Sequence, residues 1–308
     1  MKNIKLYFAF FGVLFAGHVF AQHPPVHSMY MFDQLMINPA YAGAHVQLSA
    51  TAMHRNQWQN FPGAPSTSTI TAQSTIAQNK IGLGLLLTHD VIGSHVDQNV
   101  YFSYSYKLKL PVGELNMGLQ AGVQSLKTYW DDLTLKSSLD PNFTGVLSAL
   151  NPNFGTGLFY SNKEFYAGLS VPYLLNSMVV DRALAVLSES KRNRIYYLSL
   201  GNTWDISPLF KFIPSALIRV HESAPLSFDL NTHFVYQDAV GLGVGYRLVE
   251  GFVTMFELKL NENLHVGYAY DITASDIQKY SGGSHEIMIN YRYRIPSLHK
   301  GLECPSYF

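Results

Sequence analysis

The chain has 308 residues, with 21 Lys and Arg against 21 Asp and Glu, and only 14% of its residues are charged. The balanced charge gives no electrostatic support for nucleic-acid binding, and the charged fraction is well below the quarter or so that is usual in soluble proteins. Few charges, together with 20 Tyr, 19 Phe and 23 Gly, favour a protein whose surface faces lipid. The single cysteine, Cys304, excludes an intramolecular disulfide and a cysteine-rich metal site.

The first 21 residues are typical of a secretory signal peptide. Lys2 and Lys5 form a short basic region, residues 6–20 form an almost unbroken apolar run, and Val19–Ala21 gives a cleavage site of small residues. We therefore expect residues 1–21 to be removed on export. No later stretch offers 18 consecutive apolar residues, so the sequence predicts no transmembrane helix in the mature chain.

Residues 22–44 precede the first expected strand. Asn38 and Pro39 predict a turn, because proline fixes its own φ and biases the preceding residue to an extended conformation. Gly43 permits a bend into the first strand. We expect this lead, with Asn38, Pro39, Tyr41 and Gly43 as its candidate motif, to lie in the periplasm or inside a barrel lumen. The sequence leaves open whether it only packs as a plug or also contacts a partner.

Apolar and polar residues alternate along much of the mature chain. In residues 115–123, five apolar residues alternate with Asn, Gly, Gln and Gly, so a strand here would have one apolar face and one small or polar face. The same pattern returns at residues 240–247, 264–271 and 285–294, where Met288 interrupts the polar face. This period of two predicts β-strands that separate two different environments.

Aromatic residues distinguish a membrane barrel from a soluble sandwich. Tyr268, Tyr270, Tyr291 and Tyr293 lie near strand ends on the apolar face, where the interfacial girdles of a membrane barrel would lie. Residues opposite them would line a polar lumen. The tryptophans are also expected near strand ends, because Trp prefers the membrane interface: Trp58 and Trp130 at outer ends, and Trp204 at an inner end.

We expect about fourteen strands of roughly ten residues, the length that a tilted strand needs to cross a bilayer. Their approximate cores are 46–55, 66–76, 81–89, 97–107, 115–130, 153–160, 164–171, 194–203, 209–219, 226–236, 239–247, 251–260, 263–271 and 284–295. An even number of strands returns both termini to the same side of the membrane.

The expected connections alternate in length along the chain. Short turns are expected at 77–80, 161–163, 237–238 and 261–263, and longer loops near 56–65, 131–152, 172–193 and 272–283. If the N-terminus lies in the periplasm, the short turns are periplasmic and the long loops are outside, as in outer-membrane barrels. The connections at 108–114, 204–208 and 248–250 fit this rule less well. The sequence predicts an all-β, transmembrane antiparallel barrel over residues 45–295, followed by a periplasmic tail over 296–308.

The sequence contains none of the catalytic or metal-binding motifs that we sought. Its 12 His form no H-E-x-x-H motif, and it has neither a P-loop nor a G-x-S-x-G elbow. The glycines of residues 241–245 lie in an expected strand, so we interpret them as room for lumen side chains or for close backbone approach. We expect no catalytic activity, no metal and no cofactor. An outer-membrane lipid hydrolase, with Ser, His and a carboxylate on different strands, is the less favoured alternative.

Four segments resemble a known family: Tyr30–Gly43, Arg55–Pro65, Gly267–Asp271 and Gly282–Met288. The Asn-Pro-Ala-Tyr-Ala-Gly and Arg-Asn-Gln-Trp elements within them are specific in combination. They resemble the PorP/SprF family of type IX secretion system membrane proteins from Bacteroidetes, over essentially all of the mature chain. The resemblance implies an outer-membrane barrel that supports secretion or surface attachment of partner proteins such as adhesins, and it links the chain to gliding motility.

The resemblance also implies partners. These are outer-membrane lipids, a secreted surface protein with a C-terminal sorting domain, and components of the translocon and its periplasmic ring. A small-solute porin or uptake channel is the rival function, because porins with slightly more strands enclose an open aqueous channel.

Two groups of residues are candidates for contact at the outer end of the barrel. Arg55, Asn56, Gln57 and Trp58 are expected at the first outer loop, where they would seal the barrel mouth or contact a partner. Lys191, Arg192 and Arg194 form a basic run in an expected outer loop. This run is expected to be solvated or to contact lipopolysaccharide phosphates, with which Arg and Lys pair readily.

Overall fold

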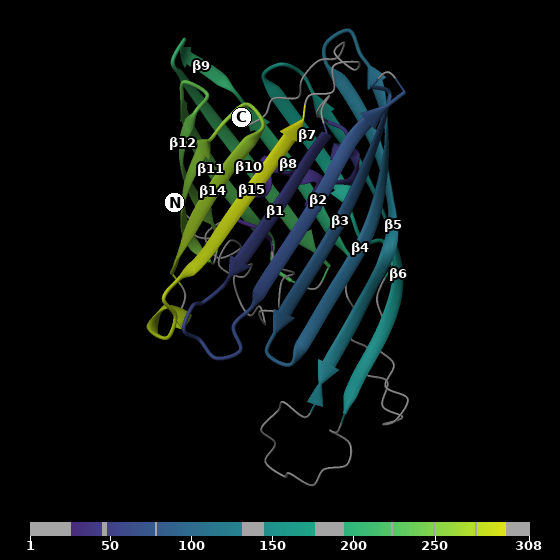
Figure 1. The fold of residues 1–308 in the computed structure, drawn as a ribbon, viewed down its shortest axis with the longest axis vertical. Helices are drawn as coiled ribbons and strands as arrows, with labels where there is room; N and C mark the ends of the chain where they lie inside the picture. Colours follow the sequence, from purple (N-terminus) through teal and green to yellow (C-terminus); the bar gives the residue numbers. More distant parts are fainter. Residues whose placement is uncertain are drawn as a thin grey trace, which may run out of the picture.

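The computed structural model describes residues 26–44, 48–77, 79–130, 145–175, 194–222, 224–248, 250–274 and 276–293. Its strands form a closed antiparallel β-barrel, as the sequence predicts (Figure 1). The expected signal peptide, the tail over 296–308 and Cys304 lie outside the described residues. Among the described residues, no helix is long and apolar enough to cross a membrane.

The strands follow one another around the barrel in chain order. They are β1 (Leu48–Asn56), β2 (Ser66–Ile76), β3 (Ile81–Ile92), β4 (His95–Lys109), β5 (Glu114–Tyr129), β6 (Val146–Ser161), β7 (Phe165–Val171), β8 (Ile195–Asn202), β9 (Trp204–Ser207), β10 (Phe210–His221), β11 (Ser227–Tyr236), β12 (Val240–Arg247), β13 (Gly251–Lys259), β14 (Leu264–Thr273) and β15 (Ser284–Tyr293). β8 and β9 both pair with β10, so they act as one interrupted strand, and the barrel wall has 14 strands.

The barrel closes between its first and last strands. β1 pairs antiparallel with β15 in a register that joins Leu48 to Tyr293 and Asn56 to His285. Every other strand pairs with its neighbours in the chain, which is the topology of an up-and-down barrel. Among the described residues, closure gives the first and last strands of the wall a neighbour on each side, the condition that a β-structure must meet inside a bilayer.

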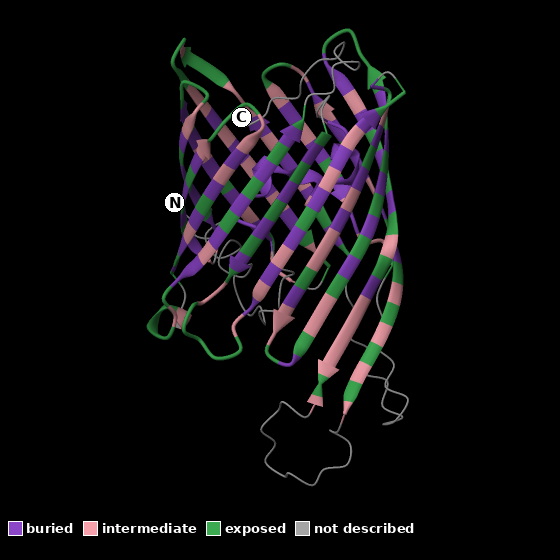
Figure 2. Ribbon diagram, viewed as in Figure 1, coloured by how far each residue is buried: buried purple, intermediate pink, exposed green. Residues whose placement is uncertain are grey.

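Apolar residues cover the outside of the barrel and polar residues cover the inside. Burial alternates residue by residue along most of the strands, so buried and exposed bands follow one another in Figure 2. Phe102 and Leu119 are 64% and 61% exposed on the outside, whereas Gln120 is only 4% exposed on the inside. This arrangement is the reverse of a soluble protein's, and it fits a wall that contacts acyl chains with its outer face.

The two ends of the barrel differ in the length of their connections. At one end, the turns 77–80, 110–113, 162–164, 208–209, 237–239 and 260–263 contain two to four residues. We call this the inner end, because outer-membrane barrels have short periplasmic turns. At the opposite, outer end β5 and β6 project beyond the other strands (Figure 1).

Strand lengths differ from the sequence prediction at three places. Residues 146–152, expected in a loop, form the outer half of β6 and pair with β5. Residues 204–207, expected in a connection, form β9, so the turn there contains only residues 208–209. β3 and β4 each extend to a tight turn at residues 93–94. In each case an antiparallel neighbour supplies hydrogen-bond partners that local composition does not reveal.

Candidate functional site

The lumen of the barrel contains the start of the described chain. Every residue from 26 to 44 is buried except Met36, which is half-buried. We call residues 26–44 the lumen plug. It appears as the purple segment inside the barrel in Figure 1. The plug begins among residues of the outer half of the wall and ends at Gly43, which lies against Gly82 near the inner end.

The lumen plug consists of three short 3-10 helices: η1 (Tyr30–Phe32), η2 (Gln34–Met36) and η3 (Pro39–Tyr41). The Asp33 side chain accepts a hydrogen bond from the backbone N–H of Leu35 and caps η2. Asn38 caps η3 in the same way, by accepting from the N–H of Ala40. Short polar residues that bond to nearby backbone favour such turns over longer helices. The plug is therefore compact, and part of its backbone hydrogen bonding is made within its own turns.

A cluster of charges binds the outer part of the plug to the wall. The Glu286 carboxylate accepts hydrogen bonds from the backbone N–H groups of Ser28 and Met29, both at 2.8 Å. The same carboxylate lies 3.2 Å from His27 Nδ1 and 3.4 Å from Arg55 Nη1. Asp271 is 2.5 Å from Arg55 Nη2. We call Arg55, Asp271 and Glu286 the anchor cluster.

The anchor cluster joins three neighbouring strands to the plug. Arg55 comes from β1, Asp271 from β14 and Glu286 from β15. Ser28 adds a second link, because its hydroxyl donates to Asp271 at 2.8 Å. Removing one member of a buried ion pair costs several kcal/mol, since it leaves the other charge without compensation. The cluster therefore fixes the outer part of the plug where β1 closes on β15.

A second group of charges continues along the inner wall. Arg219 pairs with Asp229 at 2.9 Å, and Arg247 pairs with Asp229 at 3.2 Å and with Glu250 at 2.7 Å. Burial favours a higher pKa for Glu250, but Arg247 and Arg219 oppose it and lower the pKa from 4.5 to about 2. Arg247 also lies 3.8 Å from Asp271 of the anchor cluster. These charges therefore pair with one another along the outer half of the lumen wall.

Small residues hold the inner part of the plug. A Cβ atom on Gly82 would lie 2.0 Å from the carbonyl oxygen of Ala42, and one on Gly118 would lie 2.2 Å from the backbone nitrogen of Ala40. One on Gly157 would lie 2.1 Å from Oδ1 of Asn38. The plug therefore passes so close to β3, β5 and β6 that only glycine fits at these positions.

Hydrogen bonds and ring contacts add to this fit. Asn38 donates to the carbonyl oxygen of Leu158 at 3.0 Å, and the Tyr41 ring meets Phe159 edge to face at 5.2 Å. Gly43, with a φ of +67°, donates its N–H to Gln73 at 3.1 Å. The candidate motif of Asn38, Pro39, Tyr41 and Gly43 thus lies against the wall on several sides.

Met288 is the apolar residue that interrupts the polar face of β15, and its place beside the plug explains why it faces the lumen. It is fully buried on the inner face of β15, where it interrupts the polar pattern. A Cβ on Gly267 would lie 2.9 Å from Sδ of Met29 in the plug and 3.0 Å from Cε of Met288. Met288 therefore packs near an apolar side chain of the plug.

The glycines of residues 241–245 make room for lumen side chains. A Cβ on Gly241 would meet Glu257, and one on Gly243 would meet His233, in both cases at 2.3 Å. His233 in turn contacts Phe32 of the plug edge to face at 5.2 Å. This geometry agrees with the interpretation of these glycines drawn from the sequence.

The four residues expected at the first outer loop have different positions. Arg55 is only 1% exposed and lies in β1 as part of the anchor cluster, within the strand expected over 46–55 and not in the outer loop that follows it. It points inward because side chains alternate along β1. Asn56 ends that strand and accepts a hydrogen bond from Ser66. Gln57 and Trp58 lie in the connection, where Trp58 has a φ of +46°.

The basic outer run is described only at Arg194. Its guanidinium lies 3.6 Å from Glu222 and donates to the carbonyl oxygen of Leu174 at 2.9 Å. Arg194 is thus engaged within the chain. Lys191 and Arg192 lie outside the described residues.

Sequence reasoning missed the partners that bind the plug. His27 and Ser28 lie next to the expected lead motif but were not singled out, and Asp271 and Glu286 were recognised only as residues of a polar face. The sequence feature that could have identified Asp271 and Glu286 is the presence of a carboxylate on each of two neighbouring strands, together with an arginine on the first strand. Only closure of the barrel brings β1, with Arg55, beside β15.

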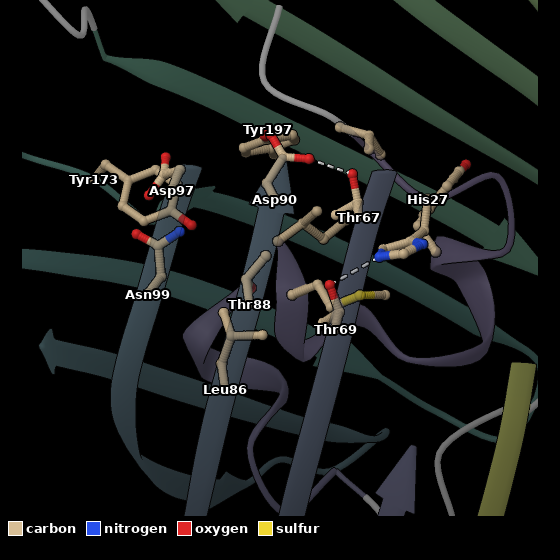
Figure 3. Close-up of a pocket in the computed structure, with 14 residues that line it drawn as sticks. His27, Thr67, Thr69, Leu86, Thr88, Asp90, Asp97, Asn99, Tyr173 and Tyr197 are labelled. Atoms are coloured by element: carbon tan, nitrogen blue, oxygen red, sulfur yellow. Dashed lines mark hydrogen bonds between the residues drawn. The ribbon is translucent and has the colours of Figure 1, made fainter. Parts of the chain in front are cut away.

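A cavity of about 70 Å³ remains between the plug and the wall (Figure 3). Its lining includes His27 from the plug, Asp90 from β3 and Asp97 from β4. His27 lies 2.8 Å from the Thr69 hydroxyl, and Thr67 donates to Asp90 at 2.5 Å. Among the described residues, no group of His, Cys, Asp and Glu is arranged to hold a metal ion.

Solved structures with similar folds are outer-membrane proteins. The CymD monoaromatic hydrocarbon channel matches with a TM-score of 0.53 and 11% identity, over 87% of this chain and 94% of that one. The outer membrane protein Omp33 of Acinetobacter baumannii matches with a TM-score of 0.46 and 9% identity, over 82% and 100% of the two chains. At these identities the similarity concerns the fold.

No curated protein matches the sequence. The family model for the type IX secretion system membrane protein PorP/SprF matches residues 19–291. This match spans the lumen plug and nearly all of the barrel wall. The chain therefore belongs to the PorP/SprF family of type IX secretion system membrane proteins.

Proposed function

We propose that this protein supports the secretion and surface attachment of partner proteins by binding them, while its barrel stays closed to solutes. Membership of the family and the outer-membrane fold support a role beside the type IX translocon. The observation that carries the proposal is the lumen plug, which is buried along its length and bound to the wall in both halves of the barrel. A protein built in this way acts through its surfaces.

The plug argues against the rival function of a porin. Most of the charged side chains that could attract a solute are paired with one another or with the plug, as the anchor cluster shows. Opening a path would require breaking these pairs and separating the plug from three glycine contacts. We therefore expect no steady flow of ions or small solutes through the resting protein.

The projecting part of β5 and β6 is the outer surface best suited to a partner. β7 pairs with β6 only from Thr156 onward, so residues 146–155 extend past that neighbour. Val146 and Leu150 on this extension are 53% and 69% exposed. Exposed apolar side chains at the end of a hairpin are typical of protein contacts. We propose that a secreted surface protein with a C-terminal sorting domain binds here, and that ring components of the translocon bind at the inner end.

Deletion of the gene tests this function. We expect one or more surface proteins to disappear from the cell surface or to be lost to the medium, with wild-type complementation restoring them. A second strain, complemented with Leu150→Asp, should contain normal amounts of barrel but less of the partner. Leu226→Asp, at an exposed position just before β11 and away from β5 and β6, is the matched control and should restore the partner. Unchanged surface and secreted proteomes in the deletion strain would contradict the proposal.

A further inference from the structure

The projecting half of β6 has one edge without a neighbouring strand. β6 pairs with β5 along its whole length, from Val146 to Ser161, whereas β7 pairs with it only from Thr156 to Ser161. At the outer end β5 and β6 therefore form a two-stranded ribbon, which extends beyond the other strands in Figure 1. Along this ribbon, the edge of β6 that faces away from β5 is open.

The backbone groups on the open edge follow from a hydrogen bond at its inner limit. In an antiparallel sheet, successive residues direct their N–H and C=O groups to opposite neighbours. The carbonyl oxygen of Phe154 accepts from the N–H of Leu174, on the β7 side. Val146, Ser148 and Leu150 therefore face the same side. None of these three has a backbone partner there among the described residues.

Asn153 explains why the neighbouring chain leaves this edge. Its side chain is 1% exposed, on the inner face of β6. The side-chain amide donates to the carbonyl oxygen of Leu175 at 2.8 Å, and Oδ1 accepts from the N–H of Leu175 at 3.0 Å. Both backbone groups of Leu175 are thus bound by this side chain, so Leu175 does not continue the pairing with β6. The open edge is therefore fixed by specific contacts.

The open edge lacks the protection that strand edges usually have. A row of free N–H and C=O groups can pair with any extended chain, and charged side chains commonly prevent this. Residues 146–152 read Val-Leu-Ser-Ala-Leu-Asn-Pro and contain no charged residue, and the proline stands at the inner limit of the edge. β9, which pairs only with β10, is a contrast, because it has four residues and includes Asp205. The edge of β6 is therefore suited to accept another strand.

The geometry of the edge defines its occupant. The free groups of Ser148 and Leu150 are two residues apart, which corresponds to roughly 7 Å along a strand. An extended polypeptide presents N–H and C=O groups at the same interval, whereas an acyl chain has no such groups. Val146 and Leu150, on the outward face beside the edge, are 53% and 69% exposed. Because side chains opposite each other on paired strands interact, the matching face of the occupant should be apolar.

We infer that residues 146–152 of β6 accept an extended segment of the secreted surface protein, which adds to the barrel as an extra strand. Main-chain hydrogen bonds hold this segment, and the exposed side chains of Val146 and Leu150 select its residues. The inference rests on the proposed function for the identity of the partner. It adds the way in which that partner binds.

Hydrogen exchange tests the added strand directly. The full-length barrel is purified alone and as a complex with the surface protein that the deletion strain loses. Mass spectrometry at single-residue resolution compares the amides of Ser148 and Leu150, on the open edge, with those of Leu147 and Ala149, which face β5. We expect the complex to slow exchange at Ser148 and Leu150 by roughly tenfold or more, since exchange then requires local separation of the added strand. Leu147 and Ala149 should be protected in both samples.

Two results of this measurement would overturn the inference. Fast exchange of Ser148 and Leu150 in the complex would mean that the partner binds without pairing to the edge. Slow exchange of the same amides in the barrel alone would mean that the edge already has a partner, in the barrel itself or in a second copy.

Two variants at one position test the edge in cells. Ser148→Pro removes the N–H on the open edge and leaves the β5 side unchanged, and edge strands tolerate proline in such positions. Ser148→Ala is the matched control, because it removes the hydroxyl but retains the N–H. In the deletion strain, complementation with Ser148→Pro should lower the surface protein bound per barrel by roughly tenfold, since a backbone hydrogen bond contributes about 0.5–1.5 kcal/mol and the ring obstructs the incoming strand. Ser148→Ala should restore it.

These results separate the inference from the proposed function. If deletion removes a surface protein and folded Ser148→Pro restores it fully, the inference fails while the proposed function is retained. If deletion changes no surface protein, the proposed function fails and the inference fails with it. Heat-dependent gel migration verifies that each variant is folded, and if Ser148→Pro is not, the exchange measurement on the wild type decides.

Discussion

Substitution of Glu286 by Gln should loosen the lumen plug without unfolding the barrel. The two carboxylate oxygens each accept one backbone N–H of the plug: Oε1 accepts from Met29 and Oε2 from Ser28, both at 2.8 Å. A glutamine retains only one acceptor oxygen, so one of these N–H groups would face an NH₂ donor. Arg55 would also lose one of its two carboxylate partners.

The expected magnitude follows from these contacts. A hydrogen bond to a charged group contributes about 1.5–3 kcal/mol, and a buried donor without a partner adds a desolvation cost. Asp271 still compensates Arg55, so the full penalty for breaking a buried pair does not apply. A loss of about 3 kcal/mol corresponds to a roughly 100-fold larger population in which the plug has left the wall.

Hydrogen exchange read by mass spectrometry measures this population. Peptides from residues 26–44 should exchange roughly 100-fold faster in Glu286→Gln than in the wild type, while peptides from β3 to β6 should keep their rates. Glu262→Gln is the matched control, because the Glu262 side chain is 90% exposed in an inner turn. Equal exchange of the plug in all three proteins would refute the role that we assign to the anchor cluster.

Three further predictions concern packing, the lipid face and acid stability. Gly118→Val should destabilise the docked plug by about 1–3 kcal/mol through overpacking, whereas Ala121→Val, on the outer face of the same strand, should not accelerate exchange of the plug. Leu242→Arg, on the outer face of β12, should lower the free energy of unfolding in lipid vesicles by about 2–4 kcal/mol. Leu209→Arg, near the inner rim, should lower it by at most about 1 kcal/mol. Equal losses in the two variants would argue against a lipid-facing wall. Because the pKa of Glu250 is lowered to about 2, its carboxylate stabilises the folded state fully above pH 4.5, and this contribution disappears as the pH falls toward 2. The difference in urea midpoint between wild type and Glu250→Gln should therefore shrink over that range, and a constant difference would contradict the pairing.

Most of the fold prediction followed from the alternation of apolar and polar residues along the chain. Strands such as β12 and β14 show a period of two with one consistently apolar face, and a strand that separates lipid from a polar lumen must have this pattern. Strand ends were harder to predict. The outer half of β6, in residues 146–152, contains Asn and Pro that favour a loop, but pairing with β5 keeps it extended. The predicted turn chemistry was correct where the turn was short, as at residues 77–80.

The lumen plug was harder to derive from the sequence, for two physical reasons. Residues 26–44 have no strand or helix period, because 3-10 turns capped by Asp33 and Asn38 interrupt the chain every few residues. The contacts that hold them are also distant in sequence: His27 and Glu286 meet only because β15 closes on β1. Arg55 is a related case: it ends the strand expected over 46–55, where a side chain can belong to the loop or to the inner wall, and in the structure it belongs to the inner wall.

The account depends most on a lumen that is closed by residues 26–44. Planar-bilayer recording of the purified wild-type barrel, compared with a folded variant that lacks these residues, tests this claim directly. We predict that the wild type gives no steady current, whereas the variant conducts ions continuously. A steady current through the wild-type protein, equal to that of the variant, would contradict the closed barrel and favour a channel.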